Sequence, residues 1–236
     1  MKSTMGCTLV SGMLFLGLSG AAGVVAAPAA KGTPNVTKPT ATAGTARHPV
    51  SLVLMAERLA RYGDQRQDPI ALIVAARIKQ DVGARTIKRE KQTRGGEGDA
   101  LKTSRPDTGV QALVARAKVM AKGRADIVAL ANEVETMRSR GVVEGSHVTI
   151  TVIRGGATDT YSLRLEGGVL AVIGISGDGA SDLDLFVEDE HGNRICEADG
   201  GSDDEICRFT PRTTGVFKVE VRNLGRIANQ YLLVTN

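Results

Sequence analysis

The chain has 236 residues with no Trp, three Tyr and four Phe, which leaves few rings for a carbohydrate-binding platform of exposed aromatic side chains. Its net charge of +4 conceals two unlike halves, because residues 28–144 carry a net +9 and residues 145–236 a net −6, with Lys2 accounting for the remainder. This split argues against a uniformly basic nucleic-acid-binding protein and favours two modules with different partners.

The N-terminal segment predicts export. Lys2 precedes an uncharged apolar stretch over 9–25, and small residues follow, which is the pattern of a signal peptide over 1–26. A membrane anchor is the alternative, since the stretch is about long enough to span a bilayer, but its many Gly and Ala residues make it weakly hydrophobic. We therefore expect a secreted or periplasmic protein with no membrane span after signal removal. Residues 27–49, rich in Thr, Pro, Ala and Gly, predict a disordered linker.

Apolar residues recur at helical spacing from 50 to 142 and predict a small domain of helical hairpins. Asp68-Pro69 predicts the start of the second helix, since Asp caps well and Pro is tolerated at the first helical position. The two hairpins resemble tetratricopeptide repeats, but two copies are fewer than an array needs, and an ordinary four-helix assembly is preferred. The expected helix ends are Gly63, Gly83, Gly123 and Gly141.

The segment 84–107 between the hairpins is basic and glycine-rich, too polar to pack and too long for a tight turn. We expect a flexible loop that is either simply solvated, which we prefer, or in contact with an anionic partner such as phospholipid or cell-surface polymer. No aromatic residue is interleaved with the charges, so nucleic acid is not expected as a partner. The anionic-partner candidates are Arg85, Lys88, Arg89, Lys91 and Arg94.

The apolar period drops to two over residues 146–236. About eight short strands separated by Gly and Asn turns predict an antiparallel β-sandwich. Cys196 and Cys207 fall on facing strands of an exported protein and are expected to form a disulfide. A zinc site would need about four ligands, and only His191 is near. In the first strand, Val148, Ile150 and Val152 alternate with Thr149, Thr151 and Ile153.

Several pieces of this region match one family pattern in order and spacing. They are an Asp-Leu-Asp-Leu-Phe strand, a Gly-Asn turn, a strand after a Pro and a Gly, and a closing Tyr-Leu-Leu. Residues 148–236 thus resemble the bacterial pre-peptidase C-terminal domain, with Phe217 in place of the usual Tyr. The resemblance implies a jelly-roll-like β-sandwich, carried by secreted hydrolases as a non-catalytic tail that aids secretion or holds a polymer. The motif residues are Asp182, Asp184, Gly192, Asn193, Gly215, Phe217 and Tyr231.

Acidic side chains gather around the same strands. Collagen-binding members of the family use calcium, and carboxylates at this density are the hard oxygen ligands that calcium prefers. Their spacing is not that of a calcium loop, so a solvated acidic hairpin is preferred, and no other cofactor is expected. The calcium candidates are Asp182, Asp184, Asp199, Asp203 and Asp204.

The fold class expected is multidomain α + β, with a helical hairpin domain followed by an antiparallel jelly-roll-like sandwich. No HExxH, GxSxG or other nucleophile–base spacing appears, so we do not expect an enzyme. We expect an exported binding or accessory protein whose sandwich holds a protein or anionic surface polymer and whose helices contact another protein. The alternatives are a peptidase-associated subunit or enzyme with an unfamiliar site, and a periplasmic scaffold of helical repeats.

Overall fold

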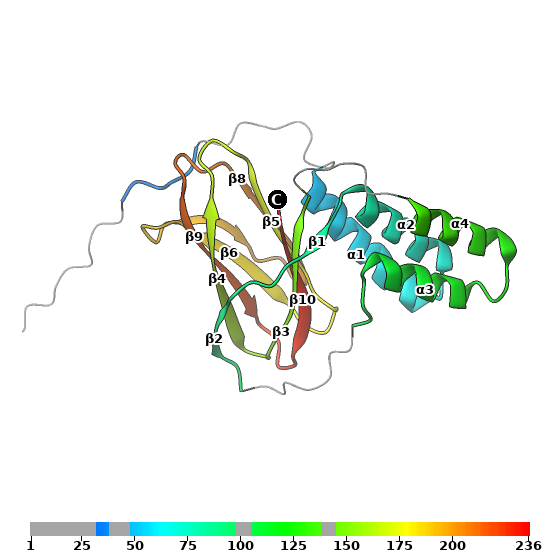
Figure 1. The fold of residues 1–236 in the computed structure, drawn as a ribbon. Coiled ribbons are helices and arrows are strands. Elements are labelled where there is room, and N and C mark those ends of the chain that lie inside the picture. Colours follow the sequence, from blue (N-terminus) through cyan, green and yellow to red (C-terminus); the bar gives the residue numbers. More distant parts are fainter. Residues whose placement is uncertain (1–31, 38–47, 98–104, 138–144) are drawn as a thin grey trace, which may run out of the picture. The chain divides into compact units, whose positions relative to one another are not determined.

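The computed structural model describes residues 32–37, 48–97, 105–137 and 145–236, and Figure 1 shows their elements in chain order. The expected signal peptide over 1–26 and most of the expected linker lie outside these residues. The helices are α1 (Pro49–Arg66), α2 (Pro69–Asp81), α3 (Val110–Met120) and α4 (Ala125–Thr136). The strands are β1 (Arg85–Thr86), β2 (Gln92–Gly95), β3 (His147–Ile153), β4 (Ala157–Leu165), β5 (Ala171–Ser176), β6 (Leu183–Glu188), β7 (Arg194–Ala198), β8 (Asp204–Phe209), β9 (Gly215–Asn223) and β10 (Asn229–Thr235).

The helices follow the sequence signals with two corrections. The fourth helix was expected to end at Gly141, which lies outside the described residues, but α4 ends at Thr136 and is followed by an extended Met137. Asp68 caps α2 as expected, because its Oδ1 accepts hydrogen bonds from the amides of Ile70 and Ala71 at 2.9 and 3.3 Å. Gly63 does not end α1, which continues to Arg66. It lies at the contact between α1 and α2, where a Cβ would be 2.7 Å from Leu72 Cδ2. Gly63 therefore serves close packing of two helices rather than helix termination.

The strands form two five-stranded sheets that pack face to face. Sheet A has the order β1-β3-β10-β5-β8 and sheet B the order β2-β4-β9-β6-β7. Strand β1 is parallel to β3, and the remaining neighbours are antiparallel. The expectation of about eight strands in a sandwich-like antiparallel fold is confirmed by β3–β10. Sheet B contributes Leu183, Leu185 and Val187 of β6 and Phe217, Val219 and Val221 of β9 to the core between the sheets, and all six are fully buried. Sheet A contributes Ile173, Ile175 and Leu233 to the same core.

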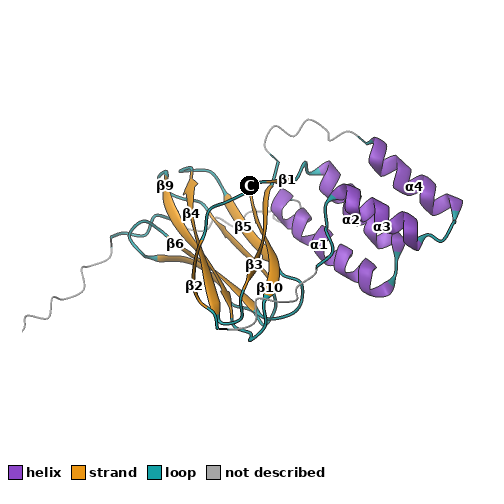
Figure 2. Ribbon diagram, turned by 60° about the horizontal axis from the view of Figure 1, so that its bottom comes forward, coloured by secondary structure: helices purple, strands orange, loops and turns teal. Residues whose placement is uncertain are grey.

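Sheet A is covered on both faces, which explains the continuous aliphatic run of β5. One face lies in the sandwich core, and α1 packs on the other through Val50, Val53 and Leu54. Gly174 of β5 permits this contact, since a Cβ there would lie 2.6 Å from Leu54 Cδ1. The helices and sheets consequently belong to one unit over 31–236, where we expected two domains at 50–142 and 146–236. Figure 2 shows α1 next to the strands of this sheet.

A buried ionic cluster lies where α1 meets the end of the sandwich. Glu57 of α1 is fully buried and accepts hydrogen bonds from Lys79, Arg105 and Thr108. Arg105 also donates to the carbonyl oxygens of Ser176 and Gly177, at 3.1 and 2.9 Å. Partners from α1, α2, residues 105–108 and the C-terminal end of β5 thus compensate the charges of this cluster, while the buried Nε of Arg105 has no hydrogen-bond partner.

The expected linker is wrong for residues 32–37, which pack on the sandwich. Asn35 is 5% exposed, and Val36 packs against the core between the sheets. The backbone amide of Thr37 donates to the carbonyl of Thr210 at 3.0 Å. A single apolar side chain and a buried amide anchor this segment, although its composition is that of a linker.

Candidate functional site

Residues 85–95, here called the strap, cross from one sheet to the other. At one end β1 pairs with β3, the edge of sheet A, and at the other end β2 pairs with β4, the edge of sheet B. Figure 1 shows this segment running across both sheets. The flexible loop expected over 84–107 is therefore wrong for this part, and residues 98–104 lie outside the described ranges. The strap is ordered because it pairs with the backbone N–H and C=O groups at two sheet edges, which would otherwise face solvent.

Two of the five cations proposed for an anionic partner point inward and hold the strap in place. Arg89 donates to the hydroxyl groups of Thr149 and Thr235, at 2.7 Å each. Lys91 donates to Asp159 Oδ2 at 2.6 Å and to the carbonyl of Val152 at 2.9 Å. Arg89 and Lys91 are thus anchors rather than exposed ligand-binding groups. This is a correction to the sequence-based expectation.

Beneath the strap lies a buried polar network that the sequence patterns did not reveal. Asp159 of β4 is fully buried and accepts hydrogen bonds from Thr93 at 2.5 Å and Tyr231 at 2.8 Å. The hydroxyl groups of Tyr231 and Tyr161 are 2.6 Å apart. Burial raises the pKa of both tyrosines well above the usual range, so both stay protonated and can donate. The sequence did contain one signal of this network. Asp159 places a carboxylate at an inward-facing position of β4, where the alternating pattern otherwise has apolar or aromatic residues.

The inward anchors also explain the orientation of β3. Ile150 and Val152 are 40% and 41% exposed, whereas Ile153 is fully buried. Thr149, on the same face as Ile153, receives the Arg89 guanidinium. The more apolar of the two alternating sets of β3, which contains Ile150 and Val152, therefore faces away from the sandwich core. The other set faces inward because its Thr149 hydrogen-bonds the strap.

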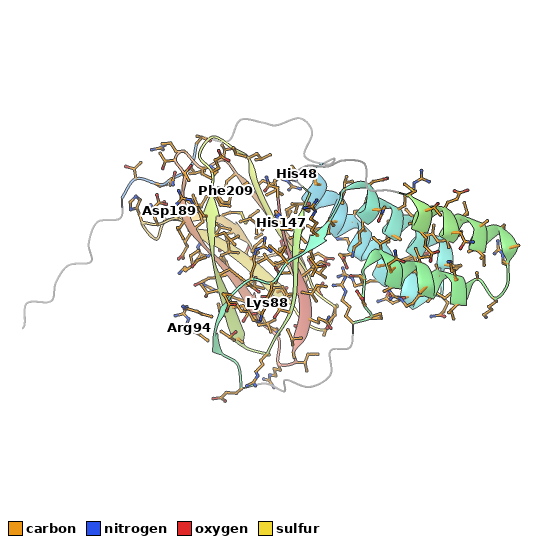
Figure 3. The ribbon with its side chains drawn as sticks, viewed as in Figure 1. His48, Lys88, Arg94, His147, Asp189 and Phe209 are labelled. Carbon is orange, nitrogen blue, oxygen red and sulfur yellow. A yellow bond between two sulfur atoms is a disulfide. The ribbon has the colours of Figure 1, made fainter. Side chains whose placement is uncertain are left out.

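The other three proposed cations are exposed on the strap. Among the described residues, neither Arg85 nor Lys88 has a side-chain hydrogen bond or ion pair, and both are exposed. Arg94 is 73% exposed, with its Nη2 3.6 Å from Glu220 Oε1. Figure 3 shows Lys88 and Arg94 along the strap. The structure thus brings three accessible positive charges onto one ordered segment.

A groove of about 1160 Å³ opens beside the strap, bounded by β4, β9 and the C-terminal end of β10. Its polar walls are of both signs. Arg164 and Lys218 contribute positive charges, while Asp189 and Glu190 lie in its wall from the turn after β6. The strap therefore forms one side of an open recess lined by both polar and apolar groups.

Two of the five calcium candidates, Asp203 and Asp204, are engaged by other groups of the chain. Asp204 pairs with Arg61 and Arg58, and although burial alone would raise its pKa, the Arg61 hydrogen bond holds that pKa below the usual value. Asp203 accepts hydrogen bonds from the amide of Gly179 and, at 3.4 Å, from Asn229. Within the described ranges no three His, Cys, Asp or Glu side chains are grouped so that they could hold a metal ion.

Three of the candidates keep a buried carboxylate oxygen without a hydrogen-bond partner. These oxygens belong to Asp182, Asp184 and Asp204. Burial, followed by the charges of Asp182 and Asp199, raises the pKa of Asp184. Calcium binding stays a prediction. Melting with millimolar calcium against a chelator tests it, and an unchanged melting temperature would contradict it.

The motif residues serve turns and packing. Gly192 has a φ of +74° in the turn after β6, and Asn193 donates to Asp189 at 2.9 Å. Phe217 packs on Phe209 with ring centroids 5.4 Å apart. The expected disulfide between Cys196 and Cys207 is confirmed, and it joins β7 of sheet B to β8 of sheet A.

No family model matches the chain, and no curated protein has a matching sequence. Among solved structures, the chain is similar to the pre-peptidase C-terminal domain of a Bacillus anthracis collagenase, with 14% identity over 38% of this chain and 87% of that one and a TM-score of 0.34. It is also similar to the Aeromonas hydrophila periplasmic inhibitor of g-type lysozyme, with 16% identity, 39% and 84% coverage and a TM-score of 0.31. A de novo designed double-stranded β-helix follows, with 18% identity, 38% and 97% coverage and a TM-score of 0.25. At these TM-scores, the similarities assign no function to this chain.

Proposed function

We propose that this protein is an exported, non-catalytic binding protein whose β-sandwich holds an anionic polymer or an acidic protein surface along the strap. The observation that carries the proposal is the exposure of Arg85, Lys88 and Arg94 on a segment fixed from beneath by Arg89 and Lys91. An ordered array loses less conformational entropy on binding than the flexible loop that the sequence suggested.

The neighbouring groove extends this surface. Arg164 lies in its wall and is exposed. A chain-like anion following the strap would reach this guanidinium without crossing the helices. Long-range attraction between such a surface and a polyanion would also raise the association rate, and added salt would screen it.

Several features support the remaining parts of the proposal. The Cys196–Cys207 disulfide suits an oxidising compartment, secreted or periplasmic. None of the described helices is both long and apolar enough to cross a membrane. We also propose a jelly-roll-like member of the pre-peptidase C-terminal family over 148–236, supported by the motif residues and by the pairing of β3 with β10 and β4 with β9.

The catalytic alternatives have no comparable support. His48, one of three histidines, caps α1 by accepting a hydrogen bond from the amide of Val50 at 3.3 Å. Burial and the charge of Arg208 lower its pKa. The role of the helices as a contact for another protein remains part of the proposal.

The test compares two matched triple variants of the chain beginning after residue 26. Arg85, Lys88 and Arg94 are changed to Ser in the strap variant, and Arg66, Arg77 and Lys122, which are exposed on the helices, are changed to Ser in the control. Binding of fluorescent heparin is measured by anisotropy across a salt series. If each strap contact contributes about 0.5 kcal/mol, the strap variant should bind about tenfold more weakly.

The salt dependence provides the second readout. The strap variant should lose part of the salt dependence of the binding constant, since fewer charges are neutralised on binding, while the control keeps both affinity and slope. An equal loss of heparin affinity in the strap variant and the control would mean that binding depends only on the net charge of the protein. No binding by the unaltered chain to heparin, or to an acidic protein such as α-lactalbumin, would reject the proposed surface.

A further inference from the structure

Residues 32–37 occupy a polar recess of the sandwich in the manner of a bound peptide. The recess lies between the turn that follows β6 and the loop that precedes β9, near Asp189 in Figure 3. Asn193 donates to the carbonyl of Gly32 at 2.9 Å, and Thr37 donates to the carbonyl of Thr210 through both its amide and its hydroxyl, at 3.0 and 3.2 Å. Both ends of the segment are thus held through hydrogen bonds.

The side chain of Asn35 is recognised at every polar atom. Its Nδ2 donates to the Glu190 carboxylate at 3.0 and 3.2 Å and to the carbonyl of Thr213 at 3.1 Å. Its Oδ1 accepts from the amides of Arg212 and Thr213 at 3.0 and 2.9 Å and from the Thr213 hydroxyl at 3.2 Å. Its backbone amide donates to Asp189 at 2.9 Å.

This arrangement distinguishes an amide from an acid. An aspartate at position 35, a position that is 5% exposed, would place a carboxylate oxygen against Glu190, where Nδ2 now donates, and would bring like charges together. An aliphatic side chain would leave the amides of Arg212 and Thr213 without acceptors. The recess is therefore selective for Asn, with an apolar residue at the next position where Val36 packs.

We propose that this recess is a peptide-binding site that also accepts residues 32–37 of a second copy of the chain. The hydrogen bonds of the segment are with residues 189–193 and 210–213, more than 150 positions along the chain, so the segment behaves as a tethered ligand. The ten residues 38–47 that join it to α1 can span at most about 35 Å when extended. A second copy would make the same contacts at no loss of contact energy.

The segment can lie in the recess of its own chain or in that of a second copy, and the covalent connection determines which of the two is favoured. A short connection between a ligand segment and its recess gives an effective concentration in the millimolar range, so a single copy at low concentration fills its own recess. Exchange is expected where copies are crowded, for example when several of them lie on one polymer. The inference does not depend on the strap, and substitutions in the strap leave it untouched.

A peptide experiment tests the recess. A labelled peptide of residues 31–38 is titrated into the unaltered chain and into the Asn35→Asp chain, whose own segment is repelled, with Asn35→Ala as a second vacated variant. We expect saturable binding to the variants at least about tenfold tighter than to the unaltered chain, where the tethered segment competes. The same peptide with Asp at position 35 should not bind. A folded variant that binds neither peptide, or both equally, would overturn the proposal.

Exchange between copies is tested by complementation. The Gly215→Val chain keeps the segment but fills the recess, since a Cβ at Gly215 would lie 3.1 Å from Asn35 Nδ2, and the Asn35→Asp chain keeps the recess but loses the segment. Each should be monomeric alone, and their mixture should form heterodimers in native mass spectrometry, with circular dichroism confirming that both are folded. Peptide binding without heterodimers would reject the second copy as the partner. Heterodimers that persist when the first chain also carries Asn35→Asp would reject the segment as the contact.

Discussion

Reduction of the Cys196–Cys207 disulfide should lower the stability of the folded protein by a predictable amount. The bond closes a loop with a sequence separation of 11, the hairpin of β7 and β8. The chain-entropy relation for a loop of this length gives about 2.8 kcal/mol at 25 °C. For a folded unit of this size, that loss corresponds to a melting temperature lower by roughly 6–11 °C.

The assay is thermal unfolding followed by circular dichroism, with and without a phosphine reductant, and with mass spectrometry to verify complete reduction. The Cys196→Ala, Cys207→Ala chain serves as the control, since reductant should not change its melting temperature. Because Cys207 is fully buried, that variant should also melt below the reduced native chain. Coincident curves for the oxidised and fully reduced native chain would refute the idea that this hairpin needs its covalent bond.

Three further predictions concern the core and its charges. Glu57→Ala should cost about 3–5 kcal/mol in urea unfolding, because Lys79 and Arg105 lose their buried carboxylate, while the exposed control Glu133→Ala should change little. Gly174→Val should cost about 1–3 kcal/mol through its clash with Leu54, and Leu54→Ala in the same chain should recover part of that loss; no recovery would contradict the packing argument. Because the pKa of Asp184 is raised on folding, its ionised form is destabilising at neutral pH, so Asp184→Asn should raise the melting temperature at pH 7. That gain should disappear below the unfolded value of 3.8, where the acid is protonated in both states, and an equal gain at both pH values would exclude ionisation as the cause.

Much of the fold follows from local rules that the sequence displays. The Asp68-Pro69 pair starts a helix because capping and proline geometry are local properties. The β6 and β9 alternations identify the inward faces because each strand has one apolar side and one polar side. The disulfide could be predicted because two cysteines lie on facing strands of a chain expected to be exported, and the alternative, a zinc site, lacked enough ligands nearby.

The remaining features depend on contacts between distant segments. The strap is ordered by the edges of β3 and β4, and its anchoring partner Asp159 is polar, so an apolar pattern cannot reveal it. Gly63 was expected to end a helix, and Gly174 lies within β5, yet both make room for a neighbouring element. Asn35 is surrounded by linker-like residues, and its partners lie in turns far along the chain.

The two open edges of the sandwich are closed in chemically different ways. At the β7–β8 side a disulfide joins the sheets, whereas at the β3–β4 side the strap that covers the edges is held by backbone pairing, hydrogen bonds and an ion pair. Local opening should therefore be directional, with amide hydrogens of β2 and β4 exchanging with solvent before those of β7 and β8. The edge that is expected to open first is therefore the one covered by the strap, and this is also the edge that carries the exposed cations.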